Sequence, residues 1–276
     1  METLRGKVAV VTGGGRGMGR SMVLGLARAG ASVVATAARE QPEIEAVAAA
    51  AYAATGRDCV LPLVADVRRE TDCRHAVEAA VNRFGALHVV VSNAGRGMKY
   101  VSESFMTEPP HFWEVDPETW RMVIDTNVNG PFFMARAAAP HLMAAGWGRI
   151  INVTMAYETM RRPGFSPYGP SKAALESETI IWAQDLAGSG VTVNALLPGG
   201  ATLTGMIPAG FPDAMKAKLL DPDIMVPPLL WLASERSDGV TGTRFVASRW
   251  RGDLPEPEAA REASENAGWL GSGGSR

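Results

Sequence analysis

The chain has 276 residues, of which 46% are hydrophobic and 20% are charged, and its formal net charge is -2. A chain of this length and composition buries enough apolar surface to offset the entropy cost of folding, which excludes general disorder and a disulfide-stapled miniprotein. The nearly balanced charge, without a basic block, argues against a nucleic-acid partner, because such partners are bound largely through their phosphates.

The cysteine and histidine content argues against disulfide and metal frameworks. The sequence contains only two cysteines, Cys59 and Cys73, and four scattered histidines without metal-ligand spacing. The first residues lack the apolar segment of a signal peptide, and every apolar stretch is interrupted before the roughly 18 residues that a membrane span needs. We therefore expect a cytoplasmic protein with no bound metal and no membrane partner.

From Lys7 onward, short β-branched segments alternate with longer Ala-rich segments of helical periodicity. This alternation is typical of repeated βαβ units, whose right-handed crossovers give a doubly wound parallel sheet with helices on both faces. The sequence therefore predicts an α/β fold. The expected strands are residues 8–11, 32–35, 59–64, 88–91, 149–153, 191–196 and 243–247.

The domain organisation is predicted from changes in composition. No linker divides residues 1–250, so we expect one domain there. Residues 251–276 are rich in Glu, Pro, Gly and Ser and predict a flexible C-terminal tail. Two stretches, 96–116 and 202–228, depart from the alternation of strand and helix and are predicted to be loops that cover a pocket.

A glycine-rich sequence follows the first expected strand. Glycines at a strand–helix junction let the backbone approach a dinucleotide pyrophosphate, and the start of the helix offers free N–H groups to phosphate. An ordinary glycine-rich turn is the alternative, which the position in a βαβ unit near the N-terminus disfavours. The expected cofactor contacts are Thr12, Gly13, Gly15, Arg16, Gly17, Met18 and Gly19.

A second motif, Tyr168-Gly169-Pro170-Ser171-Lys172, opens a helix that is predicted to run to about residue 187. Residues four apart lie on one face of a helix, so Tyr168 and Lys172 are expected to be neighbours. A nearby ammonium group favours the phenolate and lowers the pKa of a tyrosine, which would make Tyr168 a proton donor or acceptor near neutral pH. Alone, the pair is weak evidence, because such pairs also arise by chance.

The combination of motifs is far more specific than either one. It consists, in chain order, of the glycine-rich sequence, Asn93-Ala94-Gly95, Asn127 shortly before Gly130, Tyr168-x-x-x-Lys172, and Pro198-Gly199. This combination resembles the short-chain dehydrogenase/reductase family over about residues 5–248. The resemblance implies a Rossmann-type domain of about seven parallel strands, with a nicotinamide cofactor and a substrate meeting above their carboxyl ends.

The resemblance also implies roles for individual residues. Tyr168 becomes the catalytic acid/base, Lys172 lowers its pKa and holds the nicotinamide ribose, and Asn127 anchors a water molecule of a proton relay. Further expected cofactor contacts are Asp66 and Val67 near the adenine, Asn93, Ala94 and Gly95 beside the ribose, and Pro198, Gly199 and Thr202 near the carboxamide. Thr204 is a rival to Thr202, and Asp66 is alternatively a helix N-cap.

One member of the family pattern is altered. The family usually has a serine thirteen residues before the tyrosine, and Met155 stands there. A thioether cannot donate a hydrogen bond to a carbonyl. One extra residue in the loop 156–165 would bring Thr154 into the serine's place, so we predict that Thr154 orients the carbonyl. The alternatives are that Thr154 is only a strand-end residue, or that Ser166 or Ser171 serves instead.

The end of the second expected strand bears on the choice of cofactor. It holds no acidic residue, and Arg39 follows it. An acid there would bind the ribose 2'-OH of NAD, whereas arginine accommodates the 2'-phosphate of NADP. Arg39 and Arg16 therefore favour NADP(H). Glu40 keeps NAD(H) possible, and the alternative is that both arginines are merely solvated.

The expected reaction is hydride transfer between the nicotinamide and a carbonyl or secondary alcohol, with Tyr168 moving the proton. The expected apolar wall of the substrate pocket consists of Met155, Tyr157, Met160, Phe165 and Met206 together with the aromatic loop 105–113. Such a wall favours a hydrophobic small molecule. The alternatives are a catalytically silent cofactor-binding regulator and a dehydratase or epimerase on the same fold. The resemblance also implies a homotetramer, or a dimer.

Overall fold

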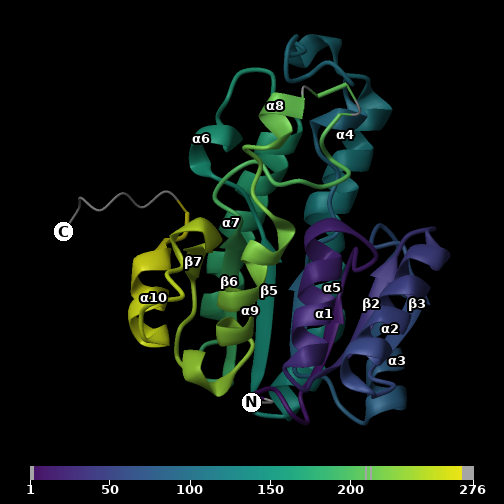
Figure 1. Cartoon of the computed structure of the whole chain (residues 1–276), viewed down its shortest axis with the longest axis vertical. Coiled ribbons are helices and arrows are strands. Elements are labelled where there is room, and N and C mark those ends of the chain that lie inside the picture. Colours follow the sequence, from purple (N-terminus) through teal and green to yellow (C-terminus); the bar gives the residue numbers. More distant parts are fainter. Residues whose placement is uncertain (1–2, 209, 212, 269–276) are drawn as a thin grey trace.

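A single, mostly parallel sheet forms the centre of the molecule (Figure 1). The computed structural model describes residues 3–208, 210–211 and 213–268. The strand order is β3-β2-β1-β4-β5-β6-β7-β8, and only the β7–β8 pair is antiparallel. The strands are β1 (Val8–Val11), β2 (Ser32–Ala37), β3 (Val60–Val64), β4 (Val89–Ser92), β5 (Gly148–Val153), β6 (Val191–Leu197), β7 (Thr243–Val246) and β8 (Ser264–Asn266). This order confirms the predicted doubly wound α/β fold.

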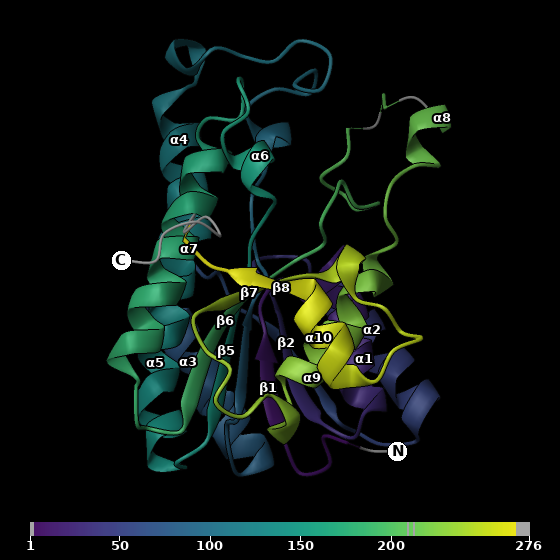
Figure 2. The same cartoon turned by 90° about the vertical axis from the view of Figure 1, so that its left-hand side faces the viewer.

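Helices cover both faces of the sheet, which Figure 2 shows from its edge. One face carries α1 (Gly17–Arg28), α2 (Gln41–Thr55), α9 (Val226–Leu232) and α10 (Glu256–Ala263). The other carries α3 (Glu70–Phe84), α5 (Gly130–Ala144) and α7 (Tyr168–Asp185). The short helices α4 (Pro117–Ile124), α6 (Tyr157–Met160) and α8 (Asp213–Lys216) lie beyond the carboxyl ends of the strands. No helix of the described part is long and apolar enough to cross a membrane.

The inner strands are buried on both faces, which explains why they appear in the sequence as continuous apolar runs. Every residue of β1, β4, β5 and β6 is buried. Two apolar layers separate the sheet from its two sets of helices. A third, smaller apolar cluster lies apart from these layers and consists of Met98, Phe105, Met155, Met160 and Phe165.

The chain beyond residue 250 differs from the predicted tail. Helix α10 buries Ala259, Ala260 and Ala263, and β8 pairs with β7, so the sheet has eight strands. The sequence did not indicate this strand because it consists of the polar residues Ser, Glu and Asn, which pairing rather than apolar periodicity holds in place. Residues 269–276 of the predicted tail lie outside the described residues.

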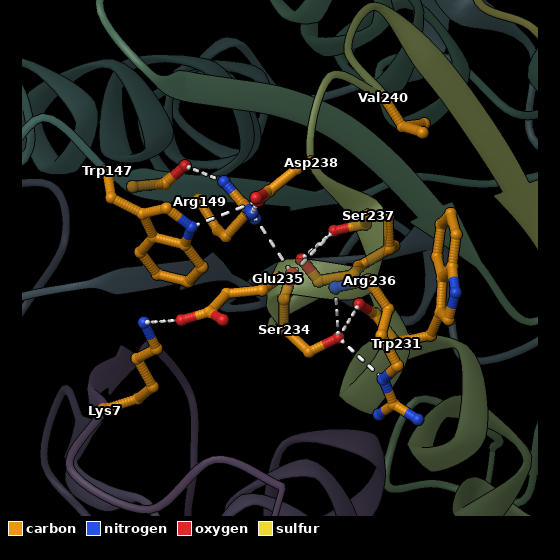
Figure 3. Close-up of polar contacts among 12 residues, drawn as sticks. Lys7, Trp147, Arg149, Trp231, Ser234, Glu235, Arg236, Ser237, Asp238 and Val240 are labelled. Carbon is orange, nitrogen blue, oxygen red and sulfur yellow. Dashed lines mark hydrogen bonds and ion pairs between the residues drawn. The ribbon is translucent and has the colours of Figure 1, made fainter.

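A buried arginine joins elements at the amino end of β5 (Figure 3). Arg149 donates to the carbonyl oxygens of Gly148 at 2.9 Å and Ser234 at 3.1 Å, and it forms an ion pair with Asp238. Its guanidinium carbon lies 3.9 Å from the centre of the Trp147 ring, whose Nε1 also donates to Asp238. The cluster lies near the amino ends of the strands, at the opposite end from the residues predicted to be functional.

Candidate active site

Two adjoining cavities lie at the carboxyl ends of the strands. The first, of about 170 Å³, is bordered by the glycine-rich turn and by the ends of β2, β3 and β4. The second, of about 310 Å³, is bordered by the ends of β4, β5 and β6 and by the start of α7. The residues that line both cavities are Met18, Asn93, Gly95, Thr204 and Met206. The two cavities therefore adjoin along these five residues.

The glycine-rich turn borders the first cavity and leads into α1. Gly17 has a φ of 50°, in the left-handed region that favours glycine. A Cβ on Gly19 would lie 1.9 Å from the carbonyl oxygen of Gly13, so only glycine allows this packing. No side chain caps the start of α1. Its first N–H groups are therefore free to bind a phosphate, as the sequence predicted.

Thr12 does not line either cavity, although the sequence suggested a cofactor contact. Its buried hydroxyl accepts hydrogen bonds from the backbone N–H groups of Asn93 and Ala94, each at 3.0 Å. The Asn93 amide in turn donates to the carbonyl oxygens of Thr12 at 2.9 Å and Gly13 at 3.1 Å. Thr12 therefore links the glycine-rich turn to the end of β4.

The end of β2 and the glycine-rich turn bring two arginines to the first cavity. Arg39 and Arg16 both line it and are exposed. Arg16 pairs with Glu43 at 3.3 Å, a carboxylate that also lines the cavity and that the sequence analysis missed. Arg39 makes no ion pair within the described part of the chain. The Arg16 guanidinium group is thus paired with a carboxylate, whereas the Arg39 guanidinium group is available to an anion in the cavity.

Asp66 and Val67 lie where the adenosine end of a dinucleotide was expected, in the lining of the first cavity. The Arg68 guanidinium beside Asp66 holds the pKa of that carboxyl below its usual range. Asp66 is not the N-cap of α3, since that position is Arg69. A third cation in this lining was not predicted from the sequence. Arg96 is buried in the lining, with its guanidinium carbon 4.4 Å from the centre of the Tyr100 ring.

Tyr168 and Lys172 both line the second cavity, one turn apart at the start of α7. The Lys172 ammonium donates to the carbonyl oxygen of Val153 at 2.7 Å. Burial raises the pKa of Tyr168 to about 12. Burial also lowers the pKa of Lys172 to about 8, although the Glu176 carboxylate acts in the opposite direction. The pKa of Tyr168 is therefore raised, whereas the sequence predicted that it would be lowered, and the cause is burial of the phenol.

Asn127 lies beneath the cavities in a π-helical turn, Asp125–Asn129, between α4 and α5. Its side chain accepts from the Arg96 N–H at 2.8 Å and donates to the Arg96 carbonyl at 2.9 Å. It also donates to the Ser171 hydroxyl at 2.9 Å, which donates to the Tyr168 carbonyl at 2.7 Å. Asn127 and Ser171 thus join the segment after β4 to the first turn of α7.

Thr154 and Met155 directly follow β5 and lie in the lining of the second cavity. The Thr154 hydroxyl donates its proton to Glu176 Oε1 at 2.7 Å. In this arrangement the proton is not available to a substrate carbonyl, which we had expected it to bind. Arg244 donates to the same carboxylate oxygen at 3.2 Å and to the Met155 carbonyl at 2.7 Å. Burial raises the pKa of Glu176, partly offset by Arg244. Glu176 was not predicted from the sequence, although its spacing of four residues from Lys172 is a signal that the two lie on one helix face.

The wall of the second cavity is largely apolar, as predicted, but its members differ. Met155, Phe165 and Met206 line it, as do Pro198, Gly199, Thr202 and Thr204. Tyr157 does not, because its hydroxyl donates to the Asn266 carbonyl at 3.1 Å and its ring lies against Arg244. Of the aromatic loop 105–113, Phe105 and Met106 line the cavity, whereas Phe112 and Trp113 are 68% exposed outside it.

Two further polar residues of the second cavity, Thr159 and Arg162, were not predicted from the sequence. Arg162, in the loop between α6 and α7, contributes to the lining. Neither its spacing nor its neighbours in the sequence signal this position. Across the described residues, no group of three or more His, Cys, Asp or Glu is placed to hold a metal ion.

Comparison with known proteins gives consistent matches. A family model described as short chain dehydrogenase matches residues 7–213. A short-chain type dehydrogenase/reductase of Picea abies is 36% identical over 215 residues, which are 76% of each chain. A 3-ketoacyl-(acyl-carrier-protein) reductase of Brucella melitensis, complexed with NADH, is 31% identical with a TM-score of 0.74, covering 86% of this chain and 95% of that one. A short chain dehydrogenase of Burkholderia cenocepacia, in complex with NADP, is 30% identical with a TM-score of 0.76, covering 88% and 96%.

Proposed function

The chain belongs to the short-chain dehydrogenase family, and from this membership we propose that it transfers a hydride between a nicotinamide cofactor and the carbonyl or secondary alcohol of a small, largely apolar molecule. The observation that carries this proposal is the position of Tyr168 and Lys172 in the wall of the second cavity, directly beside the first. A proton donor is thereby next to the point where cofactor and substrate would meet.

The residues of the first cavity fit a dinucleotide. The uncapped start of α1 at Gly17 would hold the pyrophosphate, and Asp66 and Val67 the adenosine end. Lys172, in the lining of the adjoining second cavity, would hold the nicotinamide ribose. When bound, the cofactor supplies or accepts the hydride.

The protonation state of Tyr168 favours carbonyl reduction near neutral pH. A phenol with a pKa of about 12 carries its proton there and can donate it to the substrate oxygen as the hydride reaches the carbon. The adjacent Lys172 ammonium stabilises the phenolate that remains. Asn127 and Ser171 keep the first turn of α7 fixed, so that the phenol holds its direction toward the second cavity.

Thr154 remains our candidate for the hydroxyl beside the substrate oxygen. While Glu176 is ionised, Thr154 gives its proton to that carboxylate and offers only lone pairs. Protonated Glu176 can instead donate to Thr154, which frees the Thr154 proton for the carbonyl. The raised pKa of Glu176 brings this second state closer to neutral pH.

We favour NADP(H) over NAD(H), since Arg39 lies unpaired at the first cavity within the described structure and can bind a 2'-phosphate. Glu43 works against this preference by sharing Arg16. Fluorescence titration of the protein with NADPH and NADH measures the preference directly. We expect NADPH to bind more tightly than NADH. Equal or tighter binding of NADH would reject the proposed preference for NADP(H).

We also propose a homotetramer or dimer that packs through α5 and α7, whose outer faces expose Phe132 and Ile181. Sedimentation at micromolar concentration tests this assembly. A monomeric mass would reject it.

The proposed activity is tested by Tyr168→Phe, which keeps the ring and removes the transferable proton. Oxidation of NADPH is followed with a panel of apolar ketones, and cofactor binding is measured separately. Turnover should fall by at least about 100-fold while cofactor binding is retained. The control is Tyr52→Phe, an exposed tyrosine on α2. Near-normal turnover by the Tyr168 variant would contradict the assignment, and a wild type that binds cofactor but reduces no ketone would indicate the silent alternative.

A further inference from the structure

The second cavity contains one charged group that the proposed reaction does not use. Within the described residues, Lys172 and Arg162 are the only charged side chains in its lining, and no Asp or Glu belongs to it. Lys172 is buried and bonded to the Val153 carbonyl. Arg162 is exposed and makes no ion pair with a described carboxylate. Its positive charge is therefore uncompensated at the edge of an otherwise largely apolar cavity.

Arg162 is held along the wall of this cavity. Its guanidinium carbon lies 5.3 Å from the centre of the Phe165 ring, which is itself part of the buried wall. Its backbone N–H donates to the Thr159 carbonyl at 3.3 Å. Thr159, three residues earlier, also lines the cavity, and its hydroxyl makes no hydrogen bond within the described structure. A cationic residue and a residue with an available hydroxyl thus belong to the same part of the lining.

We propose that the substrate is an amphipathic oxo acid, with an apolar body against the Met and Phe wall and a carboxylate that Arg162 and Thr159 bind at the end away from the ketone. This inference rests on the proposed reduction of a carbonyl in the same cavity. A guanidinium group binds a carboxylate with two parallel hydrogen bonds. The absence of acids from the described lining leaves no internal carboxylate to compete for it.

A neighbouring arginine, Arg161, serves as a control that separates binding by Arg162 from the effect of surface charge in general. Arg161 is also exposed, carries the same charge, and stands one residue earlier in the same loop. It does not line the cavity, and its Nε donates to the Tyr157 carbonyl at 3.3 Å. Loss of Arg161 therefore changes the net charge by the same amount without changing the cavity.

The experiment compares unbranched oxo acids of increasing length with their methyl esters, which keep the ketone and remove the charge. Steady-state reduction by the wild type, with NADPH in excess, should give a higher kcat/KM for the acid whose length matches the cavity. Arg162→Gln should lower kcat/KM for that acid about tenfold, chiefly through KM, because a partly exposed ion pair is screened by water. It should lower kcat/KM for the ester much less, because the ester carries no charge for the guanidinium group to pair with. Arg162→Lys should retain part of the preference for the acid over the ester. Arg161→Gln should retain all of this preference.

Equal kcat/KM for acid and ester in the wild type would overturn the inference, as would equal effects of Arg162→Gln and Arg161→Gln. If the wild type reduces neither compound, the proposed function fails, and titration calorimetry then tests the inference by itself. Binding of the acid that exceeds binding of the ester, and that Arg162→Gln removes, supports an oxo-acid site without turnover. Binding without that selectivity rejects it.

Discussion

Two arginines of the sheet are equally buried, each 1% exposed, yet they connect to different parts of the molecule. Arg149 lies at the amino end of β5, and its partners Asp238, Ser234 and Trp147 line neither cavity. Arg244 lies in β7 and bonds to the Met155 carbonyl and to Glu176, the acceptor of the Thr154 proton. The residue type and its burial are the same, so the partners decide whether such an arginine is purely structural or also shapes the active site.

The two clusters also differ in how their charges are solvated. Asp238, the partner of Arg149, is 59% exposed, so water stabilises its carboxylate. Arg244 has two carboxylate partners, Glu176, which is 0% exposed, and Glu265, which is 29% exposed. When a buried carboxylate loses its cationic partner, the free-energy cost of removing the carboxylate from water is no longer compensated. We therefore expect the cavity-side cluster to be the more sensitive of the two, in both stability and turnover.

The largest effect is expected for Arg244→Met. It leaves Glu176 without its nearest cation and releases the Met155 carbonyl, so the free energy of unfolding should fall by about 3–5 kcal/mol. Urea unfolding measures this loss, and turnover of any identified ketone should also fall. The double variant Arg244→Met with Glu176→Met removes both charges and should recover part of the stability. A double variant no more stable than the single one would contradict the explanation.

The same contrast shows what the sequence could predict. Seven strands were predicted to within two residues, because strands buried on both faces appear as unbroken apolar runs bounded by turns. The motif residues around Gly17, Asn93 and Tyr168 were correctly expected to come together, because the ends of parallel strands meet at one edge.

The missed features depend on contacts between distant segments. Glu176 and Arg244 are 68 residues apart in separate elements, and no spacing rule connects them. Tyr157 was expected in the wall because apolar residues near a motif often line its pocket, but a pattern does not say which way a side chain points. The pKa of Tyr168 was misjudged because proximity to Lys172 could be seen in the sequence, whereas the depth of burial could not.

A smaller effect is expected for Arg149→Met. Its carboxylate partner Asp238 can be solvated, so the loss consists mainly of hydrogen bonds to two backbone carbonyls and of contact with Trp147. We expect the free energy of unfolding to fall by about 1–3 kcal/mol, with kcat and KM unchanged at a temperature where the variant is folded. A selective loss of turnover in the folded variant would break the distinction between the two ends of the sheet.

The smallest effect is expected in the pH dependence of Glu176→Gln. The carboxylate of Glu176 raises the pKa of Lys172, which burial holds at about 8. The ammonium form holds the cofactor ribose and stabilises the phenolate, so reduction should decline as the pH rises through this pKa. Removing the carboxylate lowers the pKa further, and the midpoint of the decline should move to lower pH by about one unit.

The matched control for this shift is Glu178→Gln, on the same helix. Burial raises the pKa of Glu178 to about 7, so its titration falls near that of Lys172 and has to be separated from it. Glu178 is absent from the lining of both cavities and from the causes that act on Lys172. Its variant should therefore keep the wild-type midpoint. A midpoint that moves equally in both variants would assign the titration to general charge on α7, and a midpoint that moves in neither would remove Glu176 from the control of Lys172.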